Sequence, residues 1–233
     1  MTQLKYYEDS YLQSLKVKII SKDEDWLEFD QTIFYPLGGG QPGDTGQLVH
    51  AKGNFNIVDC RKKDGKHLHQ LENASMEIRP GDEVLTHLDW SRRYKHMKMH
   101  TAMHLLGSLI PVPVTGGSIG AEKSRLDFDL GDHQIDKQEL TDRLNELIQT
   151  GNPIEFGSIT EAYLDEHPEL IRTMSVQPPK GTGDIRTVRI TDIDYQPCGG
   201  THLSSLSEIG KVRVSKIENK GKRNRRVHLV FDD

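Results

Sequence analysis

Three histidines recur every four residues in the segment HMKMHTAMHLL, at positions 96, 100 and 104. Residues four apart on an α-helix lie on one face, so two of these imidazoles can approach a single metal ion. The later pair, His100 and His104, is favoured because the chain after it continues as an apolar helix. His96 lies between Lys95 and Lys98, where a solvated or RNA-facing position is expected. A hydrogen-bonded core histidine explains the pair alone equally well.

A second candidate half-site is the segment PCGGTHL, in which Cys198 precedes His202 across two glycines and a threonine. Glycines permit a tight backbone path that can direct a thiolate and an imidazole at one point. Zinc favours this mixture of nitrogen and sulfur ligands in tetrahedral geometry. Two pairs from separate elements therefore predict one Zn²⁺ per chain, with four ligands: His100, His104, Cys198 and His202.

Several other polar residues have a less specific interpretation. Asp192 and Asp194 precede the Cys198 segment and can orient a ligand imidazole, or they are surface residues at the end of a strand. Cys60 has no histidine at matching spacing and is expected in the core. The remaining histidines singled out are placed in polar loops without a role: His67, His69 and His133.

Length and composition limit the class of protein. The 233 residues suffice for one large domain or two small ones, and 34% of them are hydrophobic. Two cysteines make no disulfide framework, which favours a reducing compartment. No apolar run approaches the roughly 20 residues of a membrane span, and the first ten residues lack a signal-peptide core. We therefore expect a soluble cytoplasmic protein with no membrane partner.

The formal net charge of −5 argues against bulk non-specific binding of nucleic acid. Basic residues nevertheless gather in two places, and each cluster is either a solvated face or a local contact for phosphates. The first cluster is Arg92, Arg93, Lys95 and Lys98, and the second is Lys220, Lys222, Arg223, Arg225 and Arg226.

The first ninety residues are expected to form a small β-barrel. Strand-like alternation is found over residues 14–23, 25–36, 47–51, 55–60 and 83–90, with turns rich in Gly, Asn and Asp between them. Ser91 is expected to cap a helix that begins near Arg92 and ends before Pro111. This pattern predicts an N-terminal barrel domain over residues 1–90 and a second domain over residues 91–233.

The second domain mixes helices and strands. An apolar stripe at Leu140, Leu144, Leu147 and Ile148 predicts a helix, and residues 160–171 predict a shorter one. A strand pair over 117–130, a strand over 184–197 and a terminal hairpin over 211–232 complete it. The fold class is therefore α+β, with a small barrel followed by an α/β-mixed domain that contains an antiparallel sheet.

Three motifs together resemble a known family. HTAMH, followed by CGGTH about ninety residues later, resembles the editing domain of alanyl-tRNA synthetases and the free-standing AlaX editing proteins. FYPLGGGQPGDTG resembles the glycine-rich motif of the longer AlaX class, which carries an N-terminal barrel. The resemblance covers nearly the whole chain.

The resemblance implies a trans-acting, zinc-dependent deacylase for alanine tRNA charged with serine, and in the longer class also with glycine. His100, His104, Cys198 and His202 match the metal ligands of the family. Thr115 matches a threonine that helps to recognise serine, and Thr101 within HTAMH is the second candidate catalytic residue. Contacts with the substrate or the tRNA are expected from Gly38, Gly39, Gly40, Gln41, Asp44, Arg92, Arg93 and Lys98.

Two other functions remain open. Four protein ligands leave no vacant position on a tetrahedral ion, so the chain could be a zinc-stapled tRNA-binding module without catalysis. A metal-dependent hydrolase of a small ester is the third possibility, although it gives the basic clusters no purpose. No G-x-S-x-G segment is present, which disfavours a covalent mechanism and favours zinc as the organiser of the pocket, with water activated elsewhere.

Overall fold

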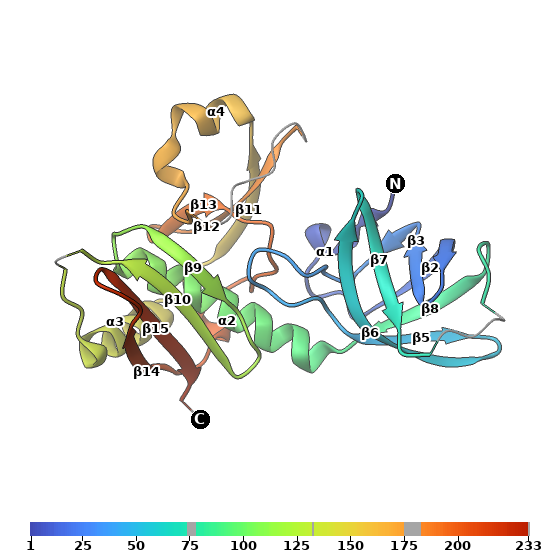
Figure 1. Cartoon of the computed structure of the whole chain (residues 1–233), viewed down its shortest axis with the longest axis horizontal. Helices are drawn as coiled ribbons and strands as arrows, with labels where there is room; N and C mark the ends of the chain where they lie inside the picture. Colours follow the sequence, from blue (N-terminus) through green and yellow to red (C-terminus); the bar gives the residue numbers. More distant parts are fainter. Residues whose placement is uncertain (74–77, 132, 175–182, 233) are drawn as a thin grey trace. The chain divides into compact units, whose positions relative to one another are not determined.

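The computed structural model describes residues 1–73, 78–131, 133–174 and 183–232, which form two compact units, Met1–Lys95 and His96–Asp233 (Figure 1). The division falls inside helix α2 (Trp90–Leu109), whereas the sequence predicted a boundary after residue 90, where this helix begins. None of the helices in the described ranges combines the length and the apolarity that a membrane span requires.

The first unit is built on a closed barrel of antiparallel strands in the order β2-β3-β7-β6-β5-β8, so the predicted small barrel is confirmed. The strands are β2 (Ser14–Asp23), β3 (Trp26–Phe29), β5 (Gly46–His50), β6 (Gly53–Lys63), β7 (Lys66–Leu71) and β8 (Glu83–Leu88). In β2, Val17 and Ile19 point into the barrel while Lys16 and Lys18 point outward, as the period of two in a strand requires. Cys60 lies in this core, as predicted.

Short elements accompany the barrel. Strand β1 (Gln3–Leu4) pairs in parallel with β4 (Gln31–Thr32), and helix α1 (Lys5–Glu8) follows β1. The strand predicted over residues 25–36 is therefore two strands, β3 and β4, followed by irregular chain.

Strand β7 was not predicted, and the placement of His67 and His69 in a polar loop is wrong. Both side chains are buried, with 8% and 1% of their surface exposed. His69 Nε2 lies 2.7 Å from Thr32 Oγ1, and its Nδ1 lies 3.2 Å from the Leu27 carbonyl oxygen. Because both ring nitrogens have partners inside the barrel, this polar side chain can occupy a core position.

Helix α2 begins at Trp90, two residues earlier than predicted, and its cap is Asp89 rather than Ser91. The Asp89 carboxylate accepts a hydrogen bond from the Arg92 amide at 3.2 Å, and its carbonyl accepts one from the Arg93 amide at 3.0 Å. A side-chain oxygen that satisfies the first free amides of a helix is the usual N-cap arrangement. The helix ends at Leu109, before Pro111, as predicted.

The second unit contains a four-stranded sheet of order β14-β15-β10-β9 and a three-stranded sheet of order β11-β12-β13, both antiparallel. The strands are β9 (Val114–Ser118), β10 (Lys123–Asp129), β11 (Ile154–Ile159), β12 (Ile185–Ile190), β13 (Asp194–Pro197), β14 (Val212–Asn219) and β15 (Asn224–Phe231). The predicted antiparallel sheet and terminal hairpin are confirmed. Strand β11 was missed, and the strand predicted over 184–197 is a hairpin that turns at Asp192, where φ is 61°.

Helix α3 (Lys137–Gln149) packs against β14 through its apolar stripe, which buries Leu140, Leu144 and Ile148 as predicted. Asn145 joins the two elements: its Nδ2 donates to the Val212 carbonyl at 2.7 Å, and its Oδ1 accepts from the Val212 amide at 3.1 Å. The short helices α4 (Glu161–Glu166), η1 (Pro168–Leu170) and η2 (Leu206–Glu208) complete the unit.

Candidate metal centre

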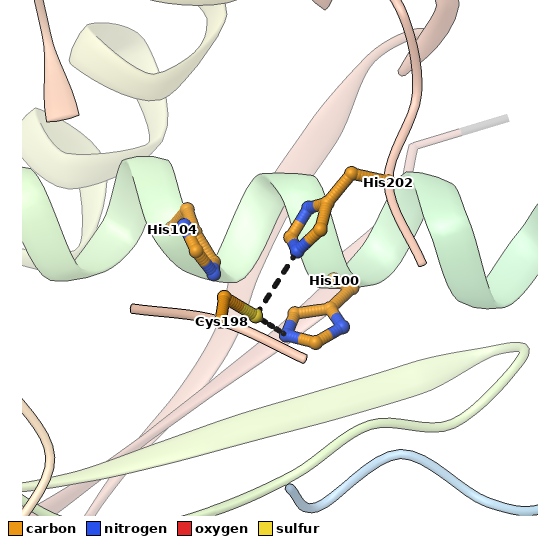
Figure 2. Close-up of side chains that lie close together, drawn as sticks. All are labelled: His100, His104, Cys198 and His202. Atoms are coloured by element: carbon orange, nitrogen blue, oxygen red, sulfur yellow. Dashed lines mark hydrogen bonds between the residues drawn. The ribbon is translucent and has the colours of Figure 1, made fainter. Parts of the chain in front are cut away.

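Four side chains from distant parts of the sequence meet inside the second unit. His100 and His104 project from helix α2, while Cys198 and His202 come from the segment that follows β13 (Figure 2). One ligand atom of each residue lies within 4.8 Å of those of all the others. Both predicted half-sites therefore face each other.

Local structure explains how each pair is aimed. His100 and His104 are one helical turn apart, and their ring centroids are 5.3 Å from each other. After β13 the chain turns so that the Cys198 thiol faces the same point, and the Gly200 amide donates to Cys198 Sγ at 3.4 Å. His202 is fully buried.

The spacing of the donor atoms suits a single tetrahedral ion. Cys198 Sγ lies 3.5 Å from His100 Nε2 and 3.3 Å from His202 Nε2. Ligands at bond lengths of about 2.0–2.3 Å in a tetrahedron are separated by roughly 3.3–3.8 Å. Three imidazoles and one thiol at these distances can hold a metal ion.

The electrostatics of the cluster favour the ligand forms of Cys198 and His202. Burial alone would raise the pKa of the Cys198 thiol, but the neighbouring imidazoles of His100, His202 and His104 hold it well below its usual range. Burial, together with the charge of His100, lowers the pKa of His202 well below its usual value. A thiolate and a neutral imidazole are the forms that coordinate metal.

His104 differs in its electrostatics. Burial opposes its charged form, but the Cys198 thiolate and the Asp194 carboxylate raise the pKa of His104 to about 10. Without a metal, both nitrogens of the His104 ring are therefore protonated near neutral pH. One of these two protons has to leave before that nitrogen can coordinate a metal ion.

Asp194 orients the His104 ring. Its Oδ2 lies 3.0 Å from His104 Nδ1, which leaves His104 Nε2 to face the cluster. Gln196 Nε2 donates to the same carboxylate at 2.6 Å, and Arg172 Nε lies 3.0 Å from its other oxygen. A carboxylate on the far nitrogen of a ligand histidine fixes the tautomer and the ring angle. Of the two aspartates considered from sequence, Asp194 has this contact, and Asp192 is an exposed turn residue.

Thr101 contacts His202, one of the four candidate metal ligands. Its side chain is fully buried, and its Oγ1 lies 3.2 Å from His202 Nδ1 and accepts a hydrogen bond from the Leu203 amide at 3.4 Å. This hydroxyl therefore orients His202. Thr115 lies half-buried in β9, where its hydroxyl donates to the Asp127 carbonyl at 3.2 Å. Direct catalytic roles for both threonines stay predictions.

The glycine-rich segment in the first unit forms a shaped turn. The Gly38 amide donates to the Gln41 carbonyl at 3.1 Å, and the Gln41 amide donates back to Gly38 at 2.9 Å. Between them Gly39 and Gly40 have φ values of 57° and 79°, in the left-handed region that glycine enters without strain. The Tyr35 hydroxyl donates to the Gly38 carbonyl at 3.0 Å and fixes the base of the turn.

Ligand contacts were expected from Gln41, Asp44 and Arg93, and these contacts stay predictions; all three side chains are at most 1% exposed. The Asp44 carboxylate accepts from the Tyr35 amide and forms an ion pair with the Arg93 guanidinium. Arg93 also donates to the Ser10 carbonyl at 3.1 Å and to the Ile33 carbonyl at 2.7 Å. The ion pair of Asp44 and Arg93 therefore joins distant segments of the first unit.

The other members of the first basic cluster differ in exposure. Arg92 and Lys98 are half-buried: Arg92 Nη1 donates to the Gly43 carbonyl at 2.7 Å, and Lys98 Nζ lies 5.7 Å from the centre of the Phe231 ring. His96 is 1% exposed, so the expectation that it is solvated or faces RNA is wrong.

Carboxylates of the same sheet pair with several residues of the second basic cluster. Arg226 Nε lies 2.7 Å from Asp127, and Arg223 Nε lies 2.9 Å from Asp129. Lys220 Nζ lies 3.2 Å from Glu218. The positive potential of the hairpin is therefore partly cancelled by its own neighbours.

Sequence patterns gave no signal for three residues that support the metal centre. Gln196 and Arg172 contact Asp194, and Arg186 contacts the backbone around Cys198. None stands at a spacing that marks a ligand, and the contacts of Arg172 and Arg186 join segments that are separate in the sequence.

Comparison with known proteins agrees with this architecture. Residues 5–92 match the family described as "tRNA synthetases class II (A)". Residues 185–228 match the family "Threonyl and Alanyl tRNA synthetase second additional domain" and include the cysteine–histidine half of the metal centre. Fold and site thus define a class of protein related to parts of these synthetases.

The chain belongs to the AlaX family of alanyl-tRNA editing proteins, as its three motifs predict. It is 34% identical to the AlaX-M protein of Methanosarcina acetivorans and 33% identical to that of Methanosarcina barkeri, with 100% of both chains covered in each case. It is also 36% identical to the alanine–tRNA ligase of Sulfurisphaera tokodaii, over 93% of this chain and 25% of the ligase.

Proposed function

We propose that this protein is a trans-acting deacylase that removes serine, and also glycine, from mischarged alanine tRNA by hydrolysing the aminoacyl ester. The observation that carries the proposal is the cluster of His100, His104, Cys198 and His202 in a chain of the alanyl-tRNA editing family. The AlaX-M relatives that match from end to end support action in trans.

We propose zinc as the metal, one ion per chain. Three imidazole nitrogens and a thiolate make a donor set that zinc favours, and Asp194 and Thr101 fix two of the imidazoles from behind. When bound, the ion supplies a fixed positive charge that shapes the pocket around the ester and the amino group of the substrate. Because the four protein ligands fill a tetrahedron, we assign the activation of water to another group.

The substrate roles of the remaining residues are part of the proposal. Thr115 is assigned to recognition of the serine side chain, and the exposed turn at Gly39 and Gly40 offers backbone groups to the 3′ end of the tRNA. Arg92 and Lys98 are the candidates for phosphate contacts, which would weaken as salt rises.

A second function, a zinc-stapled module that binds tRNA without catalysis, is favoured by one observation. Four protein ligands leave no open coordination position, as in structural zinc sites. The two functions differ in whether the ester bond is lost.

Deacylation of defined substrates tests the proposal. We expect the protein to hydrolyse serine- and glycine-charged alanine tRNA while leaving the alanine-charged tRNA intact, and we expect a zinc chelator to suppress the hydrolysis. The measurement is the loss of labelled amino acid from each tRNA over time. Binding of all three tRNAs without loss of serine or glycine would support the non-catalytic module and contradict the deacylase.

A further inference from the structure

Arg186, in strand β12, holds the segment that carries the cysteine ligand. Its Nη1 donates to the Cys198 carbonyl at 2.7 Å and to the Gly200 carbonyl at 3.0 Å. Its own carbonyl accepts a hydrogen bond from the Cys198 amide at 3.1 Å. One residue thus binds Cys198 on both sides of its peptide unit, through the backbone and through the guanidinium.

The guanidinium is itself held in place. It lies over the Phe156 ring, 4.7 Å from the ring centre, and Phe156 stands on the neighbouring strand β11. A planar guanidinium stacked on an aromatic ring loses rotational freedom before it donates, which makes its two hydrogen bonds more directional.

The segment requires such support because of its composition. Two consecutive glycines, Gly199 and Gly200, follow the cysteine, and residues without a Cβ have the widest choice of backbone conformations. Without the guanidinium, the carbonyls of Cys198 and Gly200 would lose this donor, and the position of the thiolate would be less restrained. His100 and His104, by contrast, are fixed by their helix.

We propose that Arg186 is a positioning residue for the metal ligand Cys198, acting through the two carbonyls and not by contact with the ion. This inference rests on the metal binding that is part of the proposed function, and it does not depend on deacylation. Partners behind metal ligands commonly change metal affinity by roughly 10- to 100-fold when they are removed.

The chain offers a matched control in Arg189. It lies three residues further along β12, so its side chain points to the opposite face of the sheet. Like Arg186 it stacks on an aromatic ring, with its guanidinium 4.1 Å from the centre of the Tyr195 ring, and it is exposed. Replacing either arginine by methionine removes one positive charge and one contact between a guanidinium and an aromatic ring. Of the two, only Arg186 donates hydrogen bonds to the cysteine segment.

The test is zinc affinity of the full chain, measured by competition with a chromogenic chelator, together with the absorption spectrum of the cobalt-substituted protein. We expect Arg186→Met to lower zinc affinity by roughly 10- to 100-fold and to change the sulfur-to-cobalt charge-transfer band. Arg189→Met is expected to match the wild type in both measurements. Arg186→Lys keeps a cationic donor but not the planar stack, so its affinity should fall between the two.

Equal zinc affinity and equal cobalt spectra in Arg186→Met and Arg189→Met would overturn the assignment. If Arg186→Met fails to fold, Arg186→Lys decides: weaker zinc binding than in Arg189→Met supports the assignment, and equal binding refutes it. A wild-type chain that binds no zinc would instead contradict the metal site in the proposed function, which separates the two failures.

Discussion

Replacing Cys198 with alanine is expected to abolish metal binding and to lower deacylation of serine-charged alanine tRNA by more than about 100-fold. Loss of a partner behind a ligand already costs roughly 10- to 100-fold, and loss of a ligand should exceed that effect. The thiol is also the one sulfur donor in the cluster, and it lies within 3.5 Å of two imidazole nitrogens. Three buried imidazoles without the thiolate would repel each other if protonated.

The other cysteine serves as control for this prediction. Cys60 is buried in the barrel, so Cys60→Ala tests the loss of a thiol without touching the cluster. We expect Cys60→Ala to keep its metal and most of its activity. The measurements are zinc per chain by elemental analysis and the initial rate of ester hydrolysis. Full deacylation by a metal-free Cys198→Ala protein would contradict a role of the metal in deacylation.

Breaking the buried ion pair between Arg93 and Asp44 is expected to destabilise the first unit by about 3–5 kcal/mol, because a buried charge is left without its partner. Arg93→Met also removes the hydrogen bonds to the carbonyls of Ser10 and Ile33. Both tryptophans of the chain, Trp26 and Trp90, lie in this unit, so their fluorescence during urea unfolding reports on it directly.

A surface ion pair in the same unit gives the comparison. Arg61 Nε lies 2.6 Å from Asp59, but the arginine side chain is 58% exposed, and such pairs contribute at most about 1 kcal/mol. Arg61→Met should therefore unfold close to the wild type. If Arg93→Met were as stable as Arg61→Met and impaired only in salt-dependent tRNA binding, this result would contradict the structural role and support the predicted phosphate contact.

Local sequence patterns predicted much of the fold because their signals are short-range. The alternation that places Val17 and Ile19 inside the barrel and the stripe at Leu140, Leu144 and Ile148 on α3 can both be seen without any partner. The same holds for the candidate metal centre, where each of the two residue pairs has a four-residue spacing that can be recognised in the sequence. Histidine and cysteine pairs at a fixed spacing are uncommon, so they can be recognised as candidate metal ligands in the sequence.

What could not be predicted depends on tertiary partners. Arg92 and Arg93 are adjacent residues of the same type, yet their environments differ. Arg92 is half-buried and donates to the Gly43 carbonyl, whereas Arg93 is fully buried in an ion pair with Asp44. The sequence around His69 predicts a loop, because its hydrogen-bond partners, Thr32 and the Leu27 carbonyl, come close to it only in the folded barrel. Polar side chains are buried where other segments of the chain provide hydrogen-bond partners. Which segments will pair in this way cannot be inferred from a single sequence.

X-ray absorption of the purified protein at the zinc edge, combined with elemental analysis, tests whether the four side chains hold one zinc ion. We expect one zinc per chain, bound by one sulfur at about 2.3 Å and three nitrogens at about 2.0–2.1 Å. Loss of the sulfur contribution in Cys198→Ala would tie the signal to this site. A purified chain without zinc, or with zinc bound only by nitrogen and oxygen, would contradict the assembly of His100, His104, Cys198 and His202 around one ion.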